Sequence, residues 1–161
     1  MYGKYNMTYF PIMINHAESG IRSTKPITSI KDMQSMKILS LIHIYNELNR
    51  EIAVAILHEY GFLVDTAENG AVAVEKICTS DPGRYDLVLM DVQMPVMDGC
   101  TATRRIRALK DPARAAVPIV AMTANVFEEE RRRAFDCGMN GFLSKPIVIE
   151  ELVDALKDII H

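Results

Sequence analysis

The sequence predicts an α/β protein built on a doubly wound, five-stranded parallel sheet. Two observations carry this prediction. Strand-like and helix-like segments alternate from Lys37 to the C-terminus, which gives five β-α units in succession. The strand-like segments are short, nearly continuous apolar runs, as expected for strands that are buried on both faces. Successive β-α units require parallel strands with helices on both faces of the sheet.

The first two units are defined by an apolar run and a helix signal each. The segment 37–44 (KILSLIHI) is predicted to be a buried strand. The segment 49–61 follows as a helix because its apolar residues recur at helical spacing, and Gly61 provides the stop signal. The segment 62–67 (FLVDTA) is the second strand, and the second helix begins at Gly70.

The third and fourth strands are the most apolar segments of the chain. The segment 86–90 (DLVLM) is the third strand, Asp98 and Gly99 are predicted to form a turn, and the helix 100–109 follows. The fourth strand is the segment 117–123 (VPIVAMT). Its proline lies near the start, where a missing N–H is tolerated.

The last two helices have clear ends or a clear apolar stripe. The helix 126–138 ends at a glycine, and its run EEERRR is interpreted as a solvated face with i,i+3 and i,i+4 ion pairs. The segment 141–144 (GFLS) is the fifth strand, and the helix 150–160 carries an apolar stripe. Residues 1–36 show no sustained period, so we predict a linker or mobile extension there and a single domain over residues 37–161.

Composition excludes several classes of protein. The net charge is −3 at pH 7, which gives no electrostatic support for binding nucleic acid. No segment approaches the ~20 apolar residues of a membrane span, so no membrane partner is expected. The three cysteines, Cys78, Cys100 and Cys137, have no CxxC spacing. This scattered, odd-numbered set predicts reduced thiols and a cytoplasmic location.

Three polar side chains follow the third, fourth and fifth strands. They are Asp91, Thr123 and Lys145. In doubly wound sheets, ligands bind outside the carboxyl ends of the strands. A carboxylate at this edge can act as a nucleophile toward phosphorus. A hydroxyl can hydrogen-bond one phosphoryl oxygen, and an ammonium group can pair with a second phosphoryl oxygen. Pro146 restricts the backbone of Lys145 and permits a cis peptide bond.

These residues lie in segments that resemble the response-regulator receiver domain of two-component phosphorelays, as found in hybrid histidine kinases. The matching segments run from position 46 to the C-terminus and are NELNREIA, DTAENG, DLVLMDVQMPVMDG, PIVAMTAN and CGMNGFLSKP. The resemblance implies a flavodoxin-like (βα)5 fold. It also implies that Asp91 accepts a phosphoryl group from a histidine kinase or a histidine phosphotransfer protein.

The resemblance also assigns roles to neighbouring residues. Mg²⁺ is expected to bind Asp91 and the main-chain carbonyl of Gln93. Thr123 and Lys145 match the switch hydroxyl and the phosphate-pairing lysine, and Phe142 matches the aromatic residue whose rotamer follows the switch. The output surface is then formed by the fourth helix, the fifth strand and the fifth helix.

One part of the family pattern is missing. The family usually carries two adjacent acids before the residue that matches position 46, and this chain has Ile44 and Tyr45 there. Glu47 is the nearest acid and is a weaker candidate for a metal ligand. Two lost carboxylates are expected to weaken Mg²⁺ binding. The alternative is therefore a degenerate pseudo-receiver that binds partners with weak or no Mg²⁺-dependent phosphorylation, or a chain whose residues before position 46 are not native.

An enzyme is the less favoured interpretation. Phosphatases of the haloacid dehalogenase type also place a nucleophilic aspartate after a strand, but they carry a second acid two residues later. That position is Gln93 here, which cannot act as a general acid or base. No GxGxxG follows a strand and no Walker A lysine is present. We therefore predict a signalling module that is not an enzyme.

Overall fold

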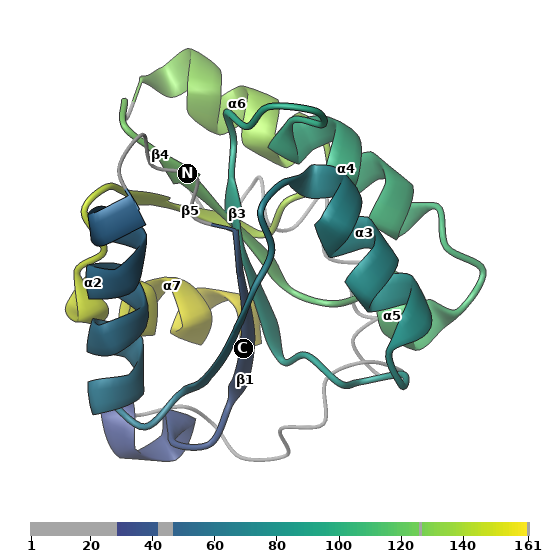
Figure 1. Cartoon of the computed structure of the whole chain (residues 1–161). Coiled ribbons are helices and arrows are strands. Elements are labelled where there is room, and N and C mark those ends of the chain that lie inside the picture. The colour runs from purple at the N-terminus through teal and green to yellow at the C-terminus, as the bar shows by residue number, and fades with distance from the viewer. Residues whose placement is uncertain (1–28, 42–46, 126, 161) are drawn as a thin grey trace.

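The computed structural model of the chain describes residues 29–41, 47–125 and 127–160 (Figure 1). The secondary-structure elements are, in chain order, η1 (Ile30–Met33), β1 (Lys37–Leu41), α2 (Glu47–Glu59), β2 (Leu63–Thr66), α3 (Gly70–Thr79), β3 (Leu87–Asp91), α4 (Gly99–Arg107), α5 (Pro112–Ala115), β4 (Ile119–Thr123), α6 (Glu128–Asp136), β5 (Gly141–Ser144) and α7 (Ile149–Ile160).

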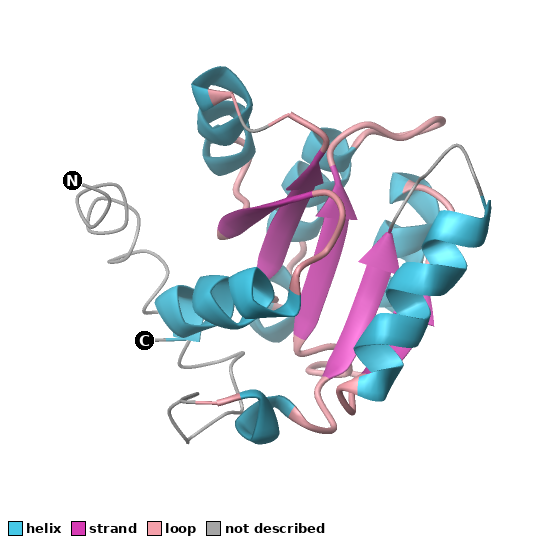
Figure 2. Ribbon diagram, turned by 90° about the vertical axis from the view of Figure 1, so that its left-hand side faces the viewer, coloured by secondary structure: helices cyan, strands magenta, loops and turns pink. Residues whose placement is uncertain are grey.

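The strands form one five-stranded sheet in the order β2-β1-β3-β4-β5. Every neighbouring pair is parallel. Helices lie on both sides of the sheet in Figure 2. The predicted doubly wound parallel sheet is therefore confirmed. Because the strands are parallel, their carboxyl ends meet at one edge, and the register pairs Asp91 with Met122 and Thr123 with Ser144 across that edge.

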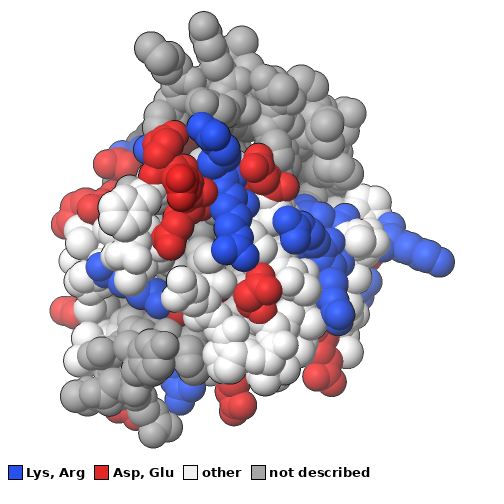
Figure 3. Space-filling model, turned by 90° about the horizontal axis from the view of Figure 1, so that it is seen from above, with Lys and Arg blue, Asp and Glu red and all other residues white. Residues whose placement is uncertain are grey.

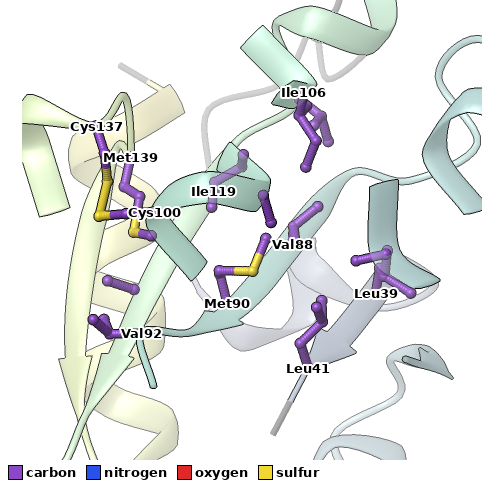
Figure 4. Packing of buried hydrophobic residues seen from close by; sticks show 14 of the residues in the cluster. Leu39, Leu41, Val88, Met90, Val92, Cys100, Ile106, Ile119, Cys137 and Met139 are labelled. Atoms are coloured by element: carbon purple, nitrogen blue, oxygen red, sulfur yellow. A yellow bond between two sulfur atoms is a disulfide. The ribbon is translucent and has the colours of Figure 1, made fainter. Parts of the chain in front are cut away.

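Alternate residues of the central strands face two separate cores. In β3, Val88 and Met90 belong to the core under α3, α4 and α6, part of which Figure 4 shows. Leu87 and Leu89 of the same strand belong to the core under α2 and α7. Because side chains alternate between the two faces and both faces are buried, nearly every position of the strand is apolar, which explains the continuous apolar runs in the sequence.

The two glycines that were predicted to end helices do so. Gly61 follows α2 with a φ of 91°, and Gly138 follows α6 with a φ of 105°. These values lie in the left-handed region, which glycine enters without a steric penalty from Cβ. The chain can therefore reverse at both points and return into the next strand.

Some element boundaries differ from the prediction. β1 ends at Leu41, and the rest of the predicted strand lies outside the described residues. The short helix α5 was not predicted. It begins with a proline, and the carboxylate of Asp111 accepts hydrogen bonds from two backbone N–H groups of its first turn. Four residues are too few to show a helical period, so α5 could be recognised only by its cap.

The expectation that all three cysteines are reduced is wrong for two of them. Cys100 and Cys137 form a disulfide between α4 and the end of α6, with their Cα atoms 5.4 Å apart (Figure 4). Cys78 is a free, exposed thiol. The two bonded residues are 37 positions apart, so no short sequence motif marks the pair. The bond ties α4 to the C-terminal end of α6.

A second long-range link involves Arg107, the last residue of α4. Its guanidinium donates hydrogen bonds to the main-chain carbonyls of Ala115, Val117 and Gly138, at 2.6 to 2.9 Å. It also donates to the side-chain oxygen of Asn140 at 2.7 Å. This side chain therefore links the connection between α5 and β4 to the connection between α6 and β5 by satisfying main-chain carbonyl groups of both.

The domain boundary between residues 36 and 37 stays a prediction. Met33, on its N-terminal side, has no exposed surface and belongs to the core under α2 and α7. Ile30 and Met36 pack against the same core. The segment Ser29–Met36 therefore contributes apolar contacts to the domain.

We predict that Met33→Ala lowers the free energy of unfolding by about 2–5 kcal/mol, because it leaves a cavity in a close-packed core. Urea unfolding followed by circular dichroism measures this change. Lys31→Ala, on the exposed face of the same short helix, is the matched control and should change stability by less than ~0.5 kcal/mol. Equal stability of the two variants would show that η1 does not pack on the domain.

Candidate functional site

The carboxyl ends of β3, β4 and β5 bring three predicted site residues together. Asp91 is the last residue of β3, Thr123 is the last residue of β4, and Lys145 directly follows β5. The backbone N–H of Lys145 donates to the carbonyl of Thr123 at 2.9 Å. These residues are far apart in the sequence, and the order of the strands places them at adjacent positions on one edge.

The carboxylate of Asp91 is buried and paired. Only 2% of its side chain is exposed, and its Oδ2 atom lies 2.5 Å from Nζ of Lys145. Its Oδ1 atom accepts the backbone N–H of Gln93 at 3.2 Å. Burial of an unpaired carboxylate is costly, so the ammonium group and this N–H are what permit the charge at the end of an apolar strand. The Lys145–Pro146 peptide bond is cis.

The hydroxyl of Thr123 is engaged by neighbouring groups. Thr123 is 8% exposed. Its Oγ1 atom accepts the backbone N–H of Asn125 at 3.1 Å and lies 2.8 Å from the carbonyl oxygen of the same residue. It also forms a short hydrogen bond with the carboxylate of Glu130 in α6. A hydroxyl has one proton, so the carbonyl and the carboxylate compete for it.

Phe142 packs against α6 rather than standing in solvent. Its ring contacts that of Phe135 edge to face, with centroids 6.5 Å apart and an interplanar angle of 81°. The guanidinium carbon of Arg131 lies 4.4 Å from the centroid of the Phe142 ring, which is a cation–π contact. The ring also packs against the core under α3, α4 and α6.

The loop after Asp91 is held close to the strand that it leaves. A Cβ atom on Gly99 would lie 2.3 Å from the carbonyl oxygen of Asp91, so a side chain here would displace that strand end. Gly99 was expected to supply a permissive turn backbone. It is instead the first residue of α4, and the reason for glycine is the lack of space. In the same loop Val96 has a φ of 67° and is 85% exposed, a rare conformation for a β-branched residue.

Asp98 caps the helix that begins beside the site. Its carboxylate accepts the backbone N–H of Thr101 and the Thr101 hydroxyl, each at 2.9 Å. The hydrogen bond from the backbone N–H of Thr101 has the largest effect on the pKa of Asp98 and lowers it. Together with the hydroxyl and the N–H of Cys100, it outweighs partial burial and holds the pKa of Asp98 below its ordinary value.

The donor set for a metal ion is small within the part of the chain that the structure describes. No group of three or more His, Cys, Asp or Glu side chains lies close enough to hold a metal there. The positions of Ile44 and Tyr45 and the side chain of Glu47 lie outside the described residues. What remains is the carboxylate of Asp91 and the main-chain carbonyl of Gln93, both oxygen donors of the kind that Mg²⁺ takes alongside water and phosphate.

Glu130 and Arg131 were missed by the sequence analysis, which placed the whole EEERRR run on a solvated face. One ion pair of the expected kind is present, between Arg131 and Glu128 at 3.7 Å. However, Glu130 lies four and seven residues before the buried Ala134 and Cys137. This i, i+4, i+7 spacing is the signal that places Glu130 on the inward-facing side of α6.

Acidic and basic side chains adjoin one another on the side of the molecule seen in Figure 3. Among the described residues in that view, neither sign of charge forms one continuous face. The described helices include none long and apolar enough to span a membrane.

The fold and the site define a receiver-like α/β protein, and comparison with known proteins identifies its family. Residues 46–157 match the family model of the response regulator receiver domain. The chain belongs to this family. It is thus a receiver domain of the kind found in two-component and hybrid histidine kinase systems.

The relatives of this chain include histidine kinases that are much longer than the chain itself. Histidine kinase 5 of Arabidopsis thaliana is 34% identical over 161 residues, an alignment that covers 85% of this chain and 17% of the relative. Hybrid signal transduction histidine kinase L of Dictyostelium discoideum is 41% identical over 113 residues, which cover 70% of this chain and 7% of the relative.

Solved structures agree with this assignment. The receiver domain of a sensor histidine kinase from Pseudomonas aeruginosa PAO1, with a magnesium ion coordinated in its active site cleft, is 36% identical with a TM-score of 0.66. The match covers 78% of this chain and 98% of that domain. The chemotaxis response regulator CheY4 of Vibrio cholerae is 26% identical with a TM-score of 0.65, over 78% of this chain and 99% of that protein.

We predict that Asp98→Asn makes stability less dependent on pH in acid. The pKa of Asp98 is lower in the folded chain than in the unfolded chain, so its charge stabilises the fold above the unfolded pKa of ~3.9. That contribution is lost as the pH falls through the lower, folded pKa. Asparagine keeps the cap, so the variant should lose about 0.5 kcal/mol at pH 7, and this loss should shrink as the pH falls toward 2.

Urea unfolding at a series of pH values from 7 to 2 measures the difference between the two proteins. A difference that stays constant across this range would show that the Asp98 charge does not interact with the start of α4.

Proposed function

We propose that this chain is the phosphoacceptor of a two-component phosphorelay. In this proposal Asp91 receives a phosphoryl group from a phosphohistidine of a histidine kinase or a histidine phosphotransfer protein. The observation that carries the proposal is the convergence of a buried carboxylate, an ammonium group and a hydroxyl at one edge of the sheet. Membership of the receiver family supports it.

The proposed transfer is a single nucleophilic displacement at phosphorus. An oxygen of the Asp91 carboxylate attacks phosphorus, the P–O bond forms as the P–N bond to the donor histidine breaks, and the imidazole nitrogen takes up a proton. Little covalent assistance is needed, because positioning and neutralisation of the phosphoryl oxygens dominate such reactions. Lys145 lies where its ammonium group can turn from the carboxylate to a phosphoryl oxygen.

The remaining residues convert the new charge into a change of surface. The Thr123 hydroxyl is the group that would donate to a phosphoryl oxygen, and its movement would free space for Phe142. Phe142 already contacts α6, so a change in its rotamer alters the surface formed by α6, β5 and α7. This is a two-state element biased by a local charge.

A Mg²⁺ ion fits the oxygen donors that the chain offers, with Asp91 and the Gln93 carbonyl as its ligands. The ion would neutralise charge on the phosphoryl oxygens during transfer. Because Ile44 and Tyr45 replace the usual acids, we infer that the ion binds more weakly than in receivers that keep both carboxylates. Glu47 remains a further candidate ligand.

The same replacement favours a second candidate, a pseudo-receiver that binds its partner without ordinary phosphorylation. The two candidates share the fold and differ in whether Asp91 becomes modified. They therefore make opposite predictions about a small phosphodonor.

We predict that incubation with acetyl phosphate and Mg²⁺ adds one phosphoryl group, seen as an adduct of about 80 Da by intact-mass spectrometry. The adduct should require millimolar or higher Mg²⁺ because few carboxylates hold the ion. Asp91→Asn should abolish it. Asp65→Asn, an acid at the end of β2 outside the site, is the matched control and should keep it. No adduct at any Mg²⁺ concentration would support the pseudo-receiver.

A further inference from the structure

We propose that Glu130 is a positioning residue that holds the Thr123 hydroxyl away from the phosphoacceptor, and that a phosphoryl group on Asp91 must displace it. The consequences for signalling rest on the proposed function, whereas the hold itself is a property of the unmodified chain. Glu130 lies outside the five short sequence segments that resemble the receiver family. The inference comes from the hydrogen bond between its carboxylate and Thr123 Oγ1.

The competition for the hydroxyl proton favours Glu130. Thr123 Oγ1 can donate to the carbonyl of Asn125 or to the carboxylate of Glu130. Hydrogen bonds to an ionised acceptor are shorter and about twice as strong as those between neutral groups. The backbone N–H of Asn125 donates to the same oxygen and further fixes the hydroxyl in this arrangement.

A phosphoryl group on Asp91 would offer the Thr123 hydroxyl a second anionic acceptor. The hydroxyl cannot donate to both anions, so binding at Asp91 and retention by Glu130 exclude each other. Glu130 therefore lowers the apparent affinity of the site for an anion by the free energy needed to release Thr123. Release of the carboxylate would in turn report the phosphorylation directly to α6.

The neighbouring Arg131 extends this hold to the second switch residue. Its guanidinium covers the Phe142 ring, so consecutive residues of α6 contact both members of the switch. The other end of the helix is tied to α4 by the disulfide of Cys137. The two ends of α6 are thus held by different chemistry, one covalent and the other reversible.

The test compares Glu130→Gln and Glu130→Ala with Glu129→Gln. Glu129 is exposed and lies in the same helical turn as Glu130. Glu129→Gln therefore removes one negative charge from this turn and leaves the hydrogen bond between Glu130 and Thr123 in place. The first measurement is made on the unliganded proteins. Three-bond couplings of the ¹³C-labelled Thr123 methyl group to backbone nitrogen and carbonyl carbon report its χ1 populations. We expect these couplings to change in both Glu130 variants, more in alanine, and to stay at the unsubstituted value in Glu129→Gln.

The second measurement is the affinity for beryllium fluoride, a tetrahedral mimic of a phosphoryl group, by titration calorimetry in saturating Mg²⁺. We expect Glu130→Ala to bind it about fivefold more tightly than Glu129→Gln, since one charge-assisted hydrogen bond no longer has to be broken. The control removes the general effect of charge on anion binding.

The outcomes separate the two proposals. If the unsubstituted chain binds no beryllium fluoride, the proposed function fails, and the methyl couplings alone decide the role of Glu130. If the couplings in both Glu130 variants match those of Glu129→Gln, Glu130 does not position Thr123 and the inference is overturned. Unfolding midpoints of all three variants establish that each is folded under the conditions used.

Discussion

The buried pair of Asp91 and Lys145 is the interaction on which the site depends. A carboxylate that is 2% exposed at the end of an apolar strand requires a cation or several hydrogen-bond donors. That cation is Lys145, which directly follows β5. In the sheet, β5 is separated from β3 only by β4, so the end of β5 lies near Asp91. Gly99 allows the following loop to pass against the Asp91 carbonyl without distortion. In the proposed function, the ammonium group that stabilises the resting carboxylate would also pair with a phosphoryl group on Asp91.

The main architecture could be predicted because its signals are local and repeated. The segments 86–90 and 117–123, which are mostly apolar, identify two buried strands, and glycines with left-handed backbone end two of the helices. Features that depend on distant residues could not be found in this way. The disulfide joins positions 37 apart, and Met33 is buried only because the chain before β1 folds back onto the core under α2 and α7.

The candidate site was predictable in its positions but not in its contacts. The rule that ligands bind at the carboxyl ends of strands selects Asp91, Thr123 and Lys145 from the sequence. It does not say which acceptor a hydroxyl prefers. Glu130 was assigned to a charged, solvated run because the composition of that run outweighed its period. The helical spacing to Ala134 contained the information, and it shows that a charged residue can belong to the inner face of a helix when a polar partner lies beneath it.

A double-mutant cycle on Asp91→Asn and Lys145→Met measures how strongly these two side chains interact. The free energies of unfolding of the unsubstituted chain, both single variants and the double variant give the coupling between the two side chains. We predict a coupling of about 1–3 kcal/mol, with the double variant less destabilised than the sum of the single variants, because each single change leaves the other group without its charged partner. Additivity within ~0.3 kcal/mol would show that the Asp91 and Lys145 side chains do not interact in solution, and that the buried carboxylate does not depend on this cation.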